Sequence, residues 1–195
     1  MNKDQTTVRN LLENPDAVIL DTETTGLKGR VIELSVIDMN GNILYSHLLD
    51  PETELPEEIT KITGITDEDL EGQPTFADEL DNIRSVLAGK TCIAWNARFD
   101  KERLDFERAL LGVNLGYTAF VDAMELYTRG MGLKMNRFGN YARKLVYAKR
   151  DLGIGDNQEH RSLSDCLDTL AVMKAFVSLD NPNPEMCPFY PKTEA

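Results

Sequence analysis

The sequence has few of the features that mark secreted, disulfide-bonded or membrane proteins. Its three cysteines, Cys92, Cys166 and Cys187, are odd in number and lack the spacing of a metal site, which favours two core thiols and one tail thiol over a disulfide framework. No apolar run approaches the ~20 residues that span a bilayer. The first residues also lack the apolar stretch of a secretory signal. We therefore expect a cytoplasmic protein with no membrane partner.

Positive charge is also scarce, because 21 Lys and Arg residues stand against 33 Asp and Glu residues and the net charge is -12. Nucleic acids are usually bound by clustered cations, so this balance opposes simple adhesion to a phosphate backbone. The charge is unevenly distributed, with twelve acids and one lysine in residues 48–81 but eight cations and three acids in residues 129–161. The basic segment could hold phosphates beside a site, although charged segments that only face solvent explain the pattern equally well.

Apolar patterning predicts one mixed α/β domain, and a chain of 195 residues suits a single core. Ala17-Val18-Ile19-Leu20 is the continuous apolar run of a strand buried on both faces. Two alternating strands surround the hairpin signal Asn40-Gly41, and shorter strands then alternate with helices. We predict strands over residues 17–20, 31–39, 43–49, 91–95 and 119–122. These strands would form a mixed sheet, three antiparallel and then two parallel, with helices on both faces.

Helical periodicity and capping signals predict the helices that accompany these strands. A short helix through Val8 precedes Pro15, and the other predicted helices cover residues 56–63, 67–71, 75–87, 98–111, 124–129, 138–148 and 163–179. We divide the chain into an N-terminal lead-in segment (residues 1–15), one domain (residues 16–180) and a Pro-rich irregular tail (residues 181–195).

Two carboxylates follow the first buried strand. Asp21 and Glu23 are two residues apart, so strand periodicity points both side chains to one side of the sheet. Adjacent anions repel unless one is protonated or a cation lies between them, and oxygen ligands favour a hard ion such as Mg²⁺ or Mn²⁺. For an isolated pair of this kind, a turn cap and a solvated glutamate would be the commoner interpretation.

Two further segments combine polar residues with the start of a helix. In the first, Asn96 ends a strand and Asp100 lies in the first helical turn, where the helix dipole favours an anion. In the second, His160 precedes Asp165, which begins the last helix. Each segment alone also fits ordinary capping and a solvated histidine.

Taken together, the three segments resemble the DEDD-type 3′-to-5′ exonucleases, in particular the histidine subgroup (DEDDh) that includes the proofreading epsilon subunit of bacterial DNA polymerase III. The matching motifs are Asp21-Thr22-Glu23-Thr24-Thr25-Gly26-Leu27, Asn96-Ala97-Arg98-Phe99-Asp100, and His160 with Asp165 after the subgroup's four-residue gap. The segment Ile62-Thr63-Gly64-Ile65-Thr66 is similar to a family element that packs against the terminal nucleotide. The resemblance covers residues 17–178.

The resemblance implies a ribonuclease H-like three-layer fold, with residues 16–180 as the exonuclease domain. It also implies hydrolysis with two divalent ions, Mg²⁺ or Mn²⁺, held by Asp21, Glu23, Asp100 and Asp165. Such a pair of cations neutralises the charge that develops on a phosphodiester during displacement. His160 would then be the catalytic base, because an imidazole can take a proton from water near neutral pH.

By the same resemblance, the 3′ end of single-stranded DNA or short RNA would be the substrate and nucleoside 5′-monophosphates the products. The residues that would contact the terminal nucleotide are Thr24, Gly26, Leu27, Ile65, Asn96 and Phe99. A DNA polymerase subunit is a further partner that the resemblance suggests. Phosphate contacts are predicted for Arg137, Arg143 and Lys144 in the basic segment.

Three positions depart from the family or match nothing in it. Trp95 and Thr63 stand where many relatives have histidine, which changes the edge of the expected substrate pocket, and a buried aromatic is the favoured interpretation of Trp95. His47 matches no family position and is expected on a strand face without a role.

Two alternatives to a DNA exonuclease remain open at this stage. One is an RNA-trimming enzyme of the same family, because the motifs do not show whether a 2′-hydroxyl is required. The other is a nucleic-acid- or polymerase-binding module that does not cut, against which the complete set of five polar residues counts.

Overall fold

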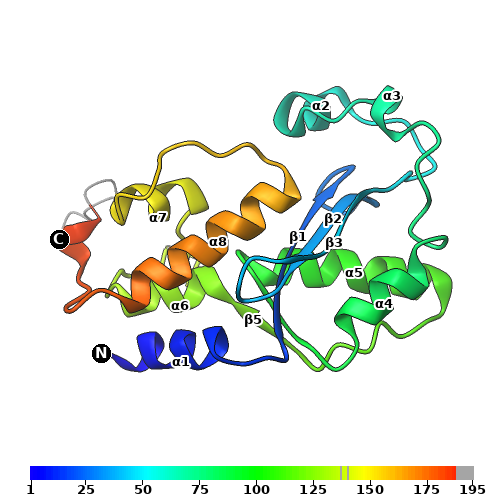
Figure 1. The fold of residues 1–195 in the computed structure, drawn as a ribbon. Helices are drawn as coiled ribbons and strands as arrows, with labels where there is room; N and C mark the ends of the chain where they lie inside the picture. The colour runs from blue at the N-terminus through cyan, green and yellow to red at the C-terminus, as the bar shows by residue number, and fades with distance from the viewer. Residues whose placement is uncertain (137, 140, 188–195) are drawn as a thin grey trace.

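One mixed sheet forms the centre of the protein, and the computed structural model describes residues 1–136, 138–139 and 141–187 (Figure 1). The strands are β1 (Ala17–Thr24), β2 (Val31–Ile37), β3 (Ile43–Leu48), β4 (Thr91–Ala94) and β5 (Ala119–Asp122). Their order across the sheet is β3-β2-β1-β4-β5, in which β1, β2 and β3 are antiparallel neighbours and β4 and β5 run parallel to β1. The predicted sheet is therefore confirmed.

Helices cover both faces of the sheet, as Figure 1 shows, which confirms the predicted three layers. One layer contains α1 (Lys3–Leu12), α6 (Ala123–Gly130), α7 (Leu145–Asp151) and α8 (Ser162–Val177). The other contains α4 (Leu80–Leu87) and α5 (Ala97–Leu111). The chain also forms α2 (Glu57–Thr63), α3 (Asp67–Leu70) and a short 3-10 helix, η1 (Pro184–Met186).

Side chains of β1 alternate between the two cores. Ala17 and Ile19 pack in the core beneath α6 and α8, whereas Val18 and Leu20 pack in the core beneath α4 and α5. Each fully buried side chain of this size contributes roughly 1.5–3 kcal/mol, so the register of β1 is strongly determined. The same alternation continues to the polar end of the strand, which turns Asp21 and Glu23 toward the α8 layer.

The starts of two helices differ from the prediction by five residues or more. The helix expected from Thr75 begins only at Leu80, because Thr75 instead closes a local turn in which its backbone N–H and hydroxyl donate to Asp78. The helix expected over residues 138–148 is α7, which covers only Leu145–Asp151 and follows residues 141–144, which form neither helix nor strand. Of the three cations proposed for phosphate contacts, Arg137 lies outside the described residues.

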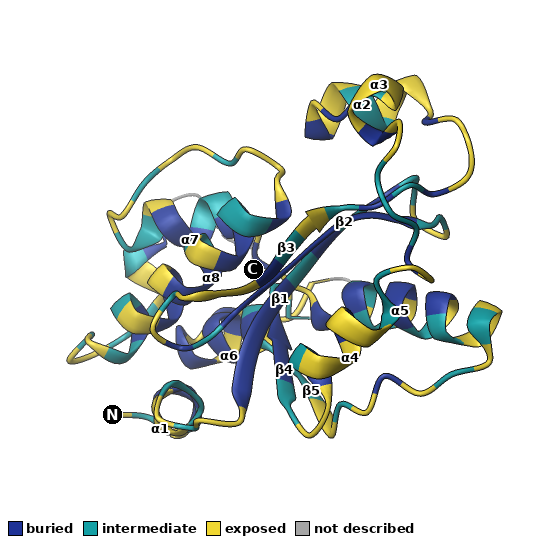
Figure 2. Ribbon diagram, turned by 45° about the vertical axis from the view of Figure 1, so that its right-hand side comes forward, coloured by how far each residue is buried: buried dark blue, intermediate teal, exposed yellow. Residues whose placement is uncertain are grey.

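Helix α1 packs against α6 and α8, and Val8 is buried in their core. Helices α2 and α3 project beyond one end of the sheet (Figure 1; Figure 2). There, Ile65 and Leu70 form a small buried cluster with Ile32 and Leu55. The divisions at residues 15 and 180 stay predictions. Among the described helices, none has the length and apolar character needed to span a bilayer.

Candidate active site

Three carboxylates meet at the end of β1. Asp21 and Glu23 come from β1 and Asp165 from the first turn of α8, and one side-chain oxygen of each lies within 4.8 Å of the others. Strand alternation places the first two on the same side, and α8 packs directly on β1 and β2. The structure thus gathers three of the four acids predicted to hold metal.

The fourth acid, Asp100, approaches β1 from the opposite layer and lies outside this group of three. It is 2% exposed in the first turn of α5, and its Oδ1 accepts hydrogen bonds from the backbone N–H and the hydroxyl of Thr22, at 3.0 and 2.9 Å. Thr22 faces α5 because it alternates with Asp21 and Glu23. The charge of Asp100 still raises the pKa of Asp21, so the two side chains are electrostatic neighbours.

Proximity of these acids makes their charged forms unfavourable without a cation. Burial, and then the charges of Asp165 and Glu33, raise the pKa of Glu23 from 4.5 to about 8. Burial raises the pKa of Asp100 to about 7 against the lowering effect of the Thr22 hydrogen bonds. For Asp21 the pKa lies well above its ordinary value, through burial and then the charge of Asp100. The group therefore favours either bound protons or a bound cation.

The donor set fits a hard divalent ion. Asp165 Oδ1 is buried and accepts no hydrogen bond from any described residue, although a buried carboxylate oxygen normally has a partner. All the available ligand atoms of Asp21, Glu23 and Asp165 are carboxylate oxygens, which bind Mg²⁺ or Mn²⁺ better than softer ions. A cation between these three side chains would satisfy the unpartnered oxygen and offset the repulsion.

His160 lies beside this group on the loop before α8. It lines a pocket of about 510 Å³ together with Asp21, Asp165 and Trp95, which we call the carboxylate pocket. Its backbone has φ 51°, a left-handed conformation that is uncommon for residues other than glycine. Burial raises the pKa of Asp165, against the lowering effects of the Gln158 hydrogen bond and then of the charge of His160. The predicted base thus shares one pocket with two of the four predicted ligands, Asp21 and Asp165.

Two residues of the site were missed by the sequence reasoning. Gln158, on the loop with His160, donates a 2.7 Å hydrogen bond from Nε2 to Asp165 Oδ2. Glu33, 5% exposed on β2, pairs directly with Glu23 across the sheet and binds Arg161 and the backbone N–H of Ser162. A lone acid within the apolar strand Val31–Ile37 was the available signal for Glu33. For Gln158 a polar loop offers no comparable signal.

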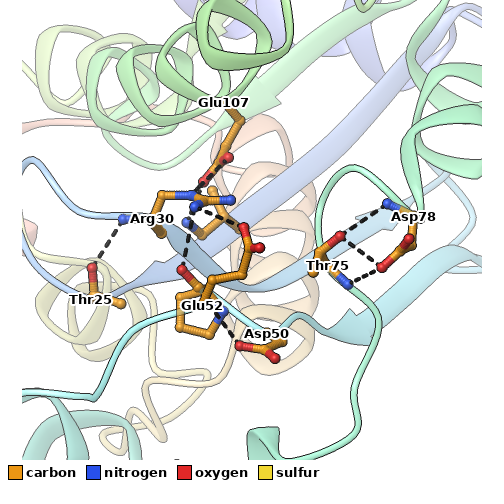
Figure 3. A network of polar contacts seen from close by, with 9 residues as sticks. Thr25, Arg30, Asp50, Glu52, Thr75, Asp78 and Glu107 are labelled. Carbon is orange, nitrogen blue, oxygen red and sulfur yellow. Dashed lines mark hydrogen bonds and ion pairs between the residues drawn. The ribbon is translucent and has the colours of Figure 1, made fainter.

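The last residue of β1 and the loop that follows it contain three of the six residues predicted to contact a nucleotide, Thr24, Gly26 and Leu27. The Thr24 hydroxyl donates to Gly26 O at 2.9 Å and is buried, whereas the Leu27 side chain is 83% exposed. Figure 3 shows two contacts that hold the end of this loop. Arg30 forms an ion pair with buried Glu107 of α5, and the backbone N–H of Arg30 donates to the hydroxyl of Thr25. An exposed apolar side chain on a firmly held loop is suited to contact with a base.

The other three predicted contact residues separate into two places. Asn96 adopts the left-handed conformation (φ 71°) before α5 and is exposed, and with Phe99 and Leu27 it lines a second pocket against α5. Ile65 is only 2% exposed within the cluster beneath α2 and α3 and lines neither pocket. Contact between these residues and a nucleotide stays a prediction.

Each position that departs from the family has partners within the protein. Trp95 is half-buried and donates from Nε1 to the backbone oxygen of Arg143 at 2.8 Å, while its ring packs on Tyr127 with centroids 5.8 Å apart. The Thr63 hydroxyl donates to Ile59 O and accepts from the backbone N–H of Ile65. His47 is exposed on β3 beside Tyr45.

The cations proposed for phosphate contacts differ in availability. The guanidinium of Arg143 is 3% exposed and forms a two-point ion pair with Asp151, whose side chain is fully buried. A buried ion pair of this kind holds α7 in place and leaves Arg143 little freedom to reach a phosphate. Lys144, in contrast, is exposed and lines the carboxylate pocket. Of the two described cations, Lys144 is the better candidate.

Comparison with known proteins agrees with this geometry. The profile of the exonuclease family RNase_T matches residues 18–173. The chain belongs to this family. It is 34% identical over 170 residues to the uncharacterized exonuclease CP81 of Escherichia phage 186, an alignment that covers 82% of this chain and 87% of the phage protein. It is 38% identical over 96 residues to the DNA polymerase III subunit epsilon of Treponema pallidum, covering 46% of this chain and 45% of the subunit.

Among solved structures, exonuclease X in complex with 5′-overhanging duplex DNA is similar to this chain, with a TM-score of 0.60 and 23% sequence identity. The superposition covers 88% of this chain and 96% of exonuclease X. This similarity establishes the fold, and the predicted ribonuclease H-like, DEDD-type assignment is confirmed at the level of the family. The chain spans less than half of the epsilon subunit, so the family match does not extend to that whole protein.

Proposed function

We propose that this protein is a metal-dependent 3′-to-5′ exonuclease that removes nucleoside 5′-monophosphates from single-stranded DNA ends. The observation that carries the proposal is the group of Asp21, Glu23 and Asp165, with its unpartnered buried oxygen. Two of these acids, Asp21 and Asp165, line one pocket with His160. Membership of the exonuclease family supports hydrolysis of phosphodiester bonds as the chemistry of this pocket.

The metal-binding residues in this proposal are Asp21, Glu23 and Asp165, with Asp100 completing the set from the α5 side. Two divalent ions, Mg²⁺ or Mn²⁺, would supply neutralisation of the charge that develops on the phosphorus. His160 accepts the proton of the attacking water on an imidazole nitrogen, and the bond from phosphorus to the 3′-oxygen of the preceding nucleotide breaks. The exposed position of His160 keeps its ring in contact with solvent between reactions.

DNA is the proposed substrate because the epsilon subunit, 38% identical over 96 residues, belongs to a DNA polymerase, and exonuclease X, 23% identical, is bound to duplex DNA. The 3′-exonuclease whose structure recognises a histone mRNA stem-loop is only 17% identical to this chain. Association with a DNA polymerase follows from the same likeness, and it would compensate for the weak attraction between DNA and a protein of net charge -12. The cytoplasmic location expected from the sequence belongs to this proposal.

The test is digestion of a 5′-labelled oligonucleotide with Mg²⁺ or Mn²⁺. The protein should generate a ladder of products shortened from the 3′ end, and both Asp21→Asn and Asp165→Asn should abolish it. His160→Ala should reduce the rate by about 10²–10⁴-fold, the usual contribution of a general base. Asp81→Asn, which removes an exposed acid from α4, is the matched control and should digest normally.

The same assay distinguishes the alternatives. Unimpaired digestion by Asp21→Asn or Asp165→Asn would refute the assignment. Digestion of short RNA in preference to DNA would make the protein an RNA-trimming enzyme. Tight binding of oligonucleotides without product under either ion would instead identify a binding module.

A further inference from the structure

A second pocket, of about 460 Å³, opens between the loop after β1 and the outer face of α5. We call it the α5 pocket. Leu27 and Lys28 line it from the loop, and Phe99, Arg103 and Phe106 line it from α5. It meets the carboxylate pocket at Asn96, which lines both. A nucleic-acid strand with one nucleotide in the carboxylate pocket could therefore extend into the α5 pocket.

Both walls of the α5 pocket are held in place. Arg30 ends the loop and binds Glu107 of α5, whose Oε1 also accepts the backbone N–H of Val31 (Figure 3). Arg103 Nη1 donates to the backbone oxygen of Gly29 at 3.3 Å, which joins α5 to the loop a second time. The pocket is thus a formed feature of the protein, and binding would require little ordering of its walls.

Among the cations of the α5 pocket, Arg103 is buried without a carboxylate of the described residues paired with its guanidinium. It is 6% exposed, its Nε is buried without a hydrogen-bond partner, and it forms no ion pair with any described carboxylate. The guanidinium lies over the Phe106 ring, 5.8 Å from its centroid. A buried guanidinium is stable when an anion compensates it, and phosphate matches its fork of N–H donors.

Charge and aromatic surface in the α5 pocket suit a nucleotide. Three cations line it, Lys28, Arg98 and Arg103, against one acid, Glu102, so it is locally positive in a chain of net charge -12. The Phe106 side chain remains 38% exposed at the pocket. Bases stack on exposed aromatic rings regardless of sequence, while nearby cations bind the backbone.

We propose that the α5 pocket binds one nucleotide outside the reacting phosphodiester, with its phosphate at Arg103 and its base against Phe106. The inference rests on the proposed function and deepens it, since it concerns how the same nucleic acid is held. The nucleotide could come from the digested strand, upstream of its 3′ end, or from a complementary strand paired with it. The shared chemistry is a base joined to a phosphate.

The experiment measures binding without turnover. Fluorescence anisotropy of labelled oligonucleotides in EDTA compares the protein with Phe106→Ala and Arg103→Gln, and with Arg108→Gln as a matched control. Arg108 is a cation of α5 outside the pocket, paired with Asp105. Phe106→Ala should raise Kd about tenfold, the size of one lost stacked base. Arg103→Gln should lower the slope of log Kd against log salt by about 0.7–0.9, as for one lost phosphate contact.

The two sources of the nucleotide give different results. Equal losses on single strands and on duplexes with a 5′ overhang would assign the pocket to the digested strand, and losses confined to duplexes would assign it to the complementary strand. Unchanged Kd and salt slope in both variants, with both correctly folded by circular dichroism, would overturn the proposal. Because Phe106 is partly exposed, Phe106→Ala tests the pocket even if Arg103→Gln is unstable.

A mononucleotide substrate separates this inference from the proposed function. Hydrolysis of the p-nitrophenyl ester of thymidine 5′-monophosphate by the unmodified protein tests the carboxylate group by itself, because this ester has no second nucleotide to occupy the α5 pocket. Arg108→Gln should hydrolyse the ester at the normal rate. If the unmodified protein hydrolyses neither the ester nor an oligonucleotide, the proposed function fails, while the anisotropy comparison still decides the α5 pocket.

Discussion

Glu33 and Arg161 join the sheet to the loop that carries His160, through a hydrogen bond of 2.6 Å from Arg161 Nη2 to Glu33 Oε1. Ser162 is the first residue of α8, and its backbone N–H donates to the other carboxylate oxygen of Glu33 at 2.7 Å. Below it, the hydroxyls of Ser35 and Ser162 lie 2.7 Å apart. These contacts determine where α8 begins, and therefore where Asp165 stands relative to β1.

Glu33 is accordingly a positioning residue, and Glu33→Gln should lower kcat for oligonucleotide digestion by about 10–100-fold, the usual effect of losing a partner that orients metal ligands. KM should change little, because Glu33 lines neither pocket. The substitution replaces a carboxylate oxygen with an amide that cannot accept from both Arg161 and Ser162. Steady-state kinetics on a labelled oligonucleotide measures both constants.

A pH profile separates this positioning role from general destabilisation. The charge of Glu33 raises the pKa of Glu23, so removing it should lower that pKa and extend metal binding to lower pH. Isothermal titration with Mn²⁺ across the pH range would detect the change. Arg161→Lys, which keeps the charge but loses the two-point contact, should reduce kcat without moving the pH profile. Normal kcat and an unmoved profile in Glu33→Gln would contradict the assignment.

The free energy of unfolding of the metal-free protein should fall as pH rises from about 5 to about 8. Folding raises the pKa of Glu23 from 4.5 to about 8, so in this interval the folded state keeps a proton that the unfolded state has released. Stability therefore decreases with pH, because the folded state binds more protons. Thermal unfolding in EDTA at a series of pH values measures the trend.

Divalent ions should reverse this pH dependence. They compete with protons for the same oxygens, so Mn²⁺ should raise Tm most at pH 8 and least at pH 5. Glu23→Gln should flatten the trend in EDTA and weaken the Mn²⁺ effect, whereas Glu58→Gln, at an exposed position of α2, should behave as the unmodified protein. A Tm in EDTA that rises steadily toward pH 8 would show that the acids are not protonated as the structure indicates.

The sheet and the common side of Asp21 and Glu23 were predictable because they depend on local patterns, whereas the addition of Asp165 was implied only by the family resemblance. The run Ala17-Val18-Ile19-Leu20 has the composition of a strand buried on both faces, and strand alternation then requires Asp21 and Glu23 to share a side. The hairpin between β2 and β3 was also predicted from its turn residues, but not as a two-residue turn. Five residues, 38–42, separate the strands, and the Gly41 N–H donates to Asp38 O, so that Met39 and Asn40 are the central residues of the turn. In such places the local preference and the tertiary structure agree.

What could not be predicted depends on contacts between distant segments. The Gln158 contact with Asp165 lies within a polar loop of no periodicity, and the pairing of Glu33 with Arg161 joins residues 128 positions apart. Burial of Arg143 was missed because its partner Asp151 is recognisable only once α7 packs on the domain. The start of α4 was misplaced because Thr75 has the sequence of a helix cap but closes a turn.

Lys149 is expected to hold the loop before α8 in place. Its Nζ donates to the backbone oxygen of Asn157 at 2.7 Å and forms an ion pair of 2.5 Å with Asp168, although the side chain is only 6% exposed. Lys149→Met should cost at most about 3–5 kcal/mol, since it leaves one partner of a buried ion pair alone. Loop residues 153–160 should also become more sensitive to protease, a readout that loss of helix packing elsewhere would not produce.

The comparison for Lys149→Met is Lys174→Met, which removes an exposed lysine from α8. Denaturant unfolding and limited proteolysis followed by mass spectrometry measure stability and loop cleavage in both variants. If Lys149→Met unfolds at the same denaturant concentration as Lys174→Met and its loop resists cleavage equally, Lys149 does not hold the loop.

Leu27→Ala should impair digestion without destabilising the protein. The side chain is 83% exposed, so truncating it removes little buried surface and the free energy of unfolding should change by less than about 0.5 kcal/mol. In its predicted role as an apolar wedge against the terminal bases, Leu27 would matter most where paired bases must be separated. Digestion of paired 3′ ends should therefore slow about tenfold or more, corresponding to about 1.4 kcal/mol of lost contact, while single strands should be affected less.

Leu110→Ala is the matched control, because that leucine is 56% exposed on α5 and lines neither pocket. Equal rates for both variants on paired and single-stranded ends would exclude Leu27 from substrate contact.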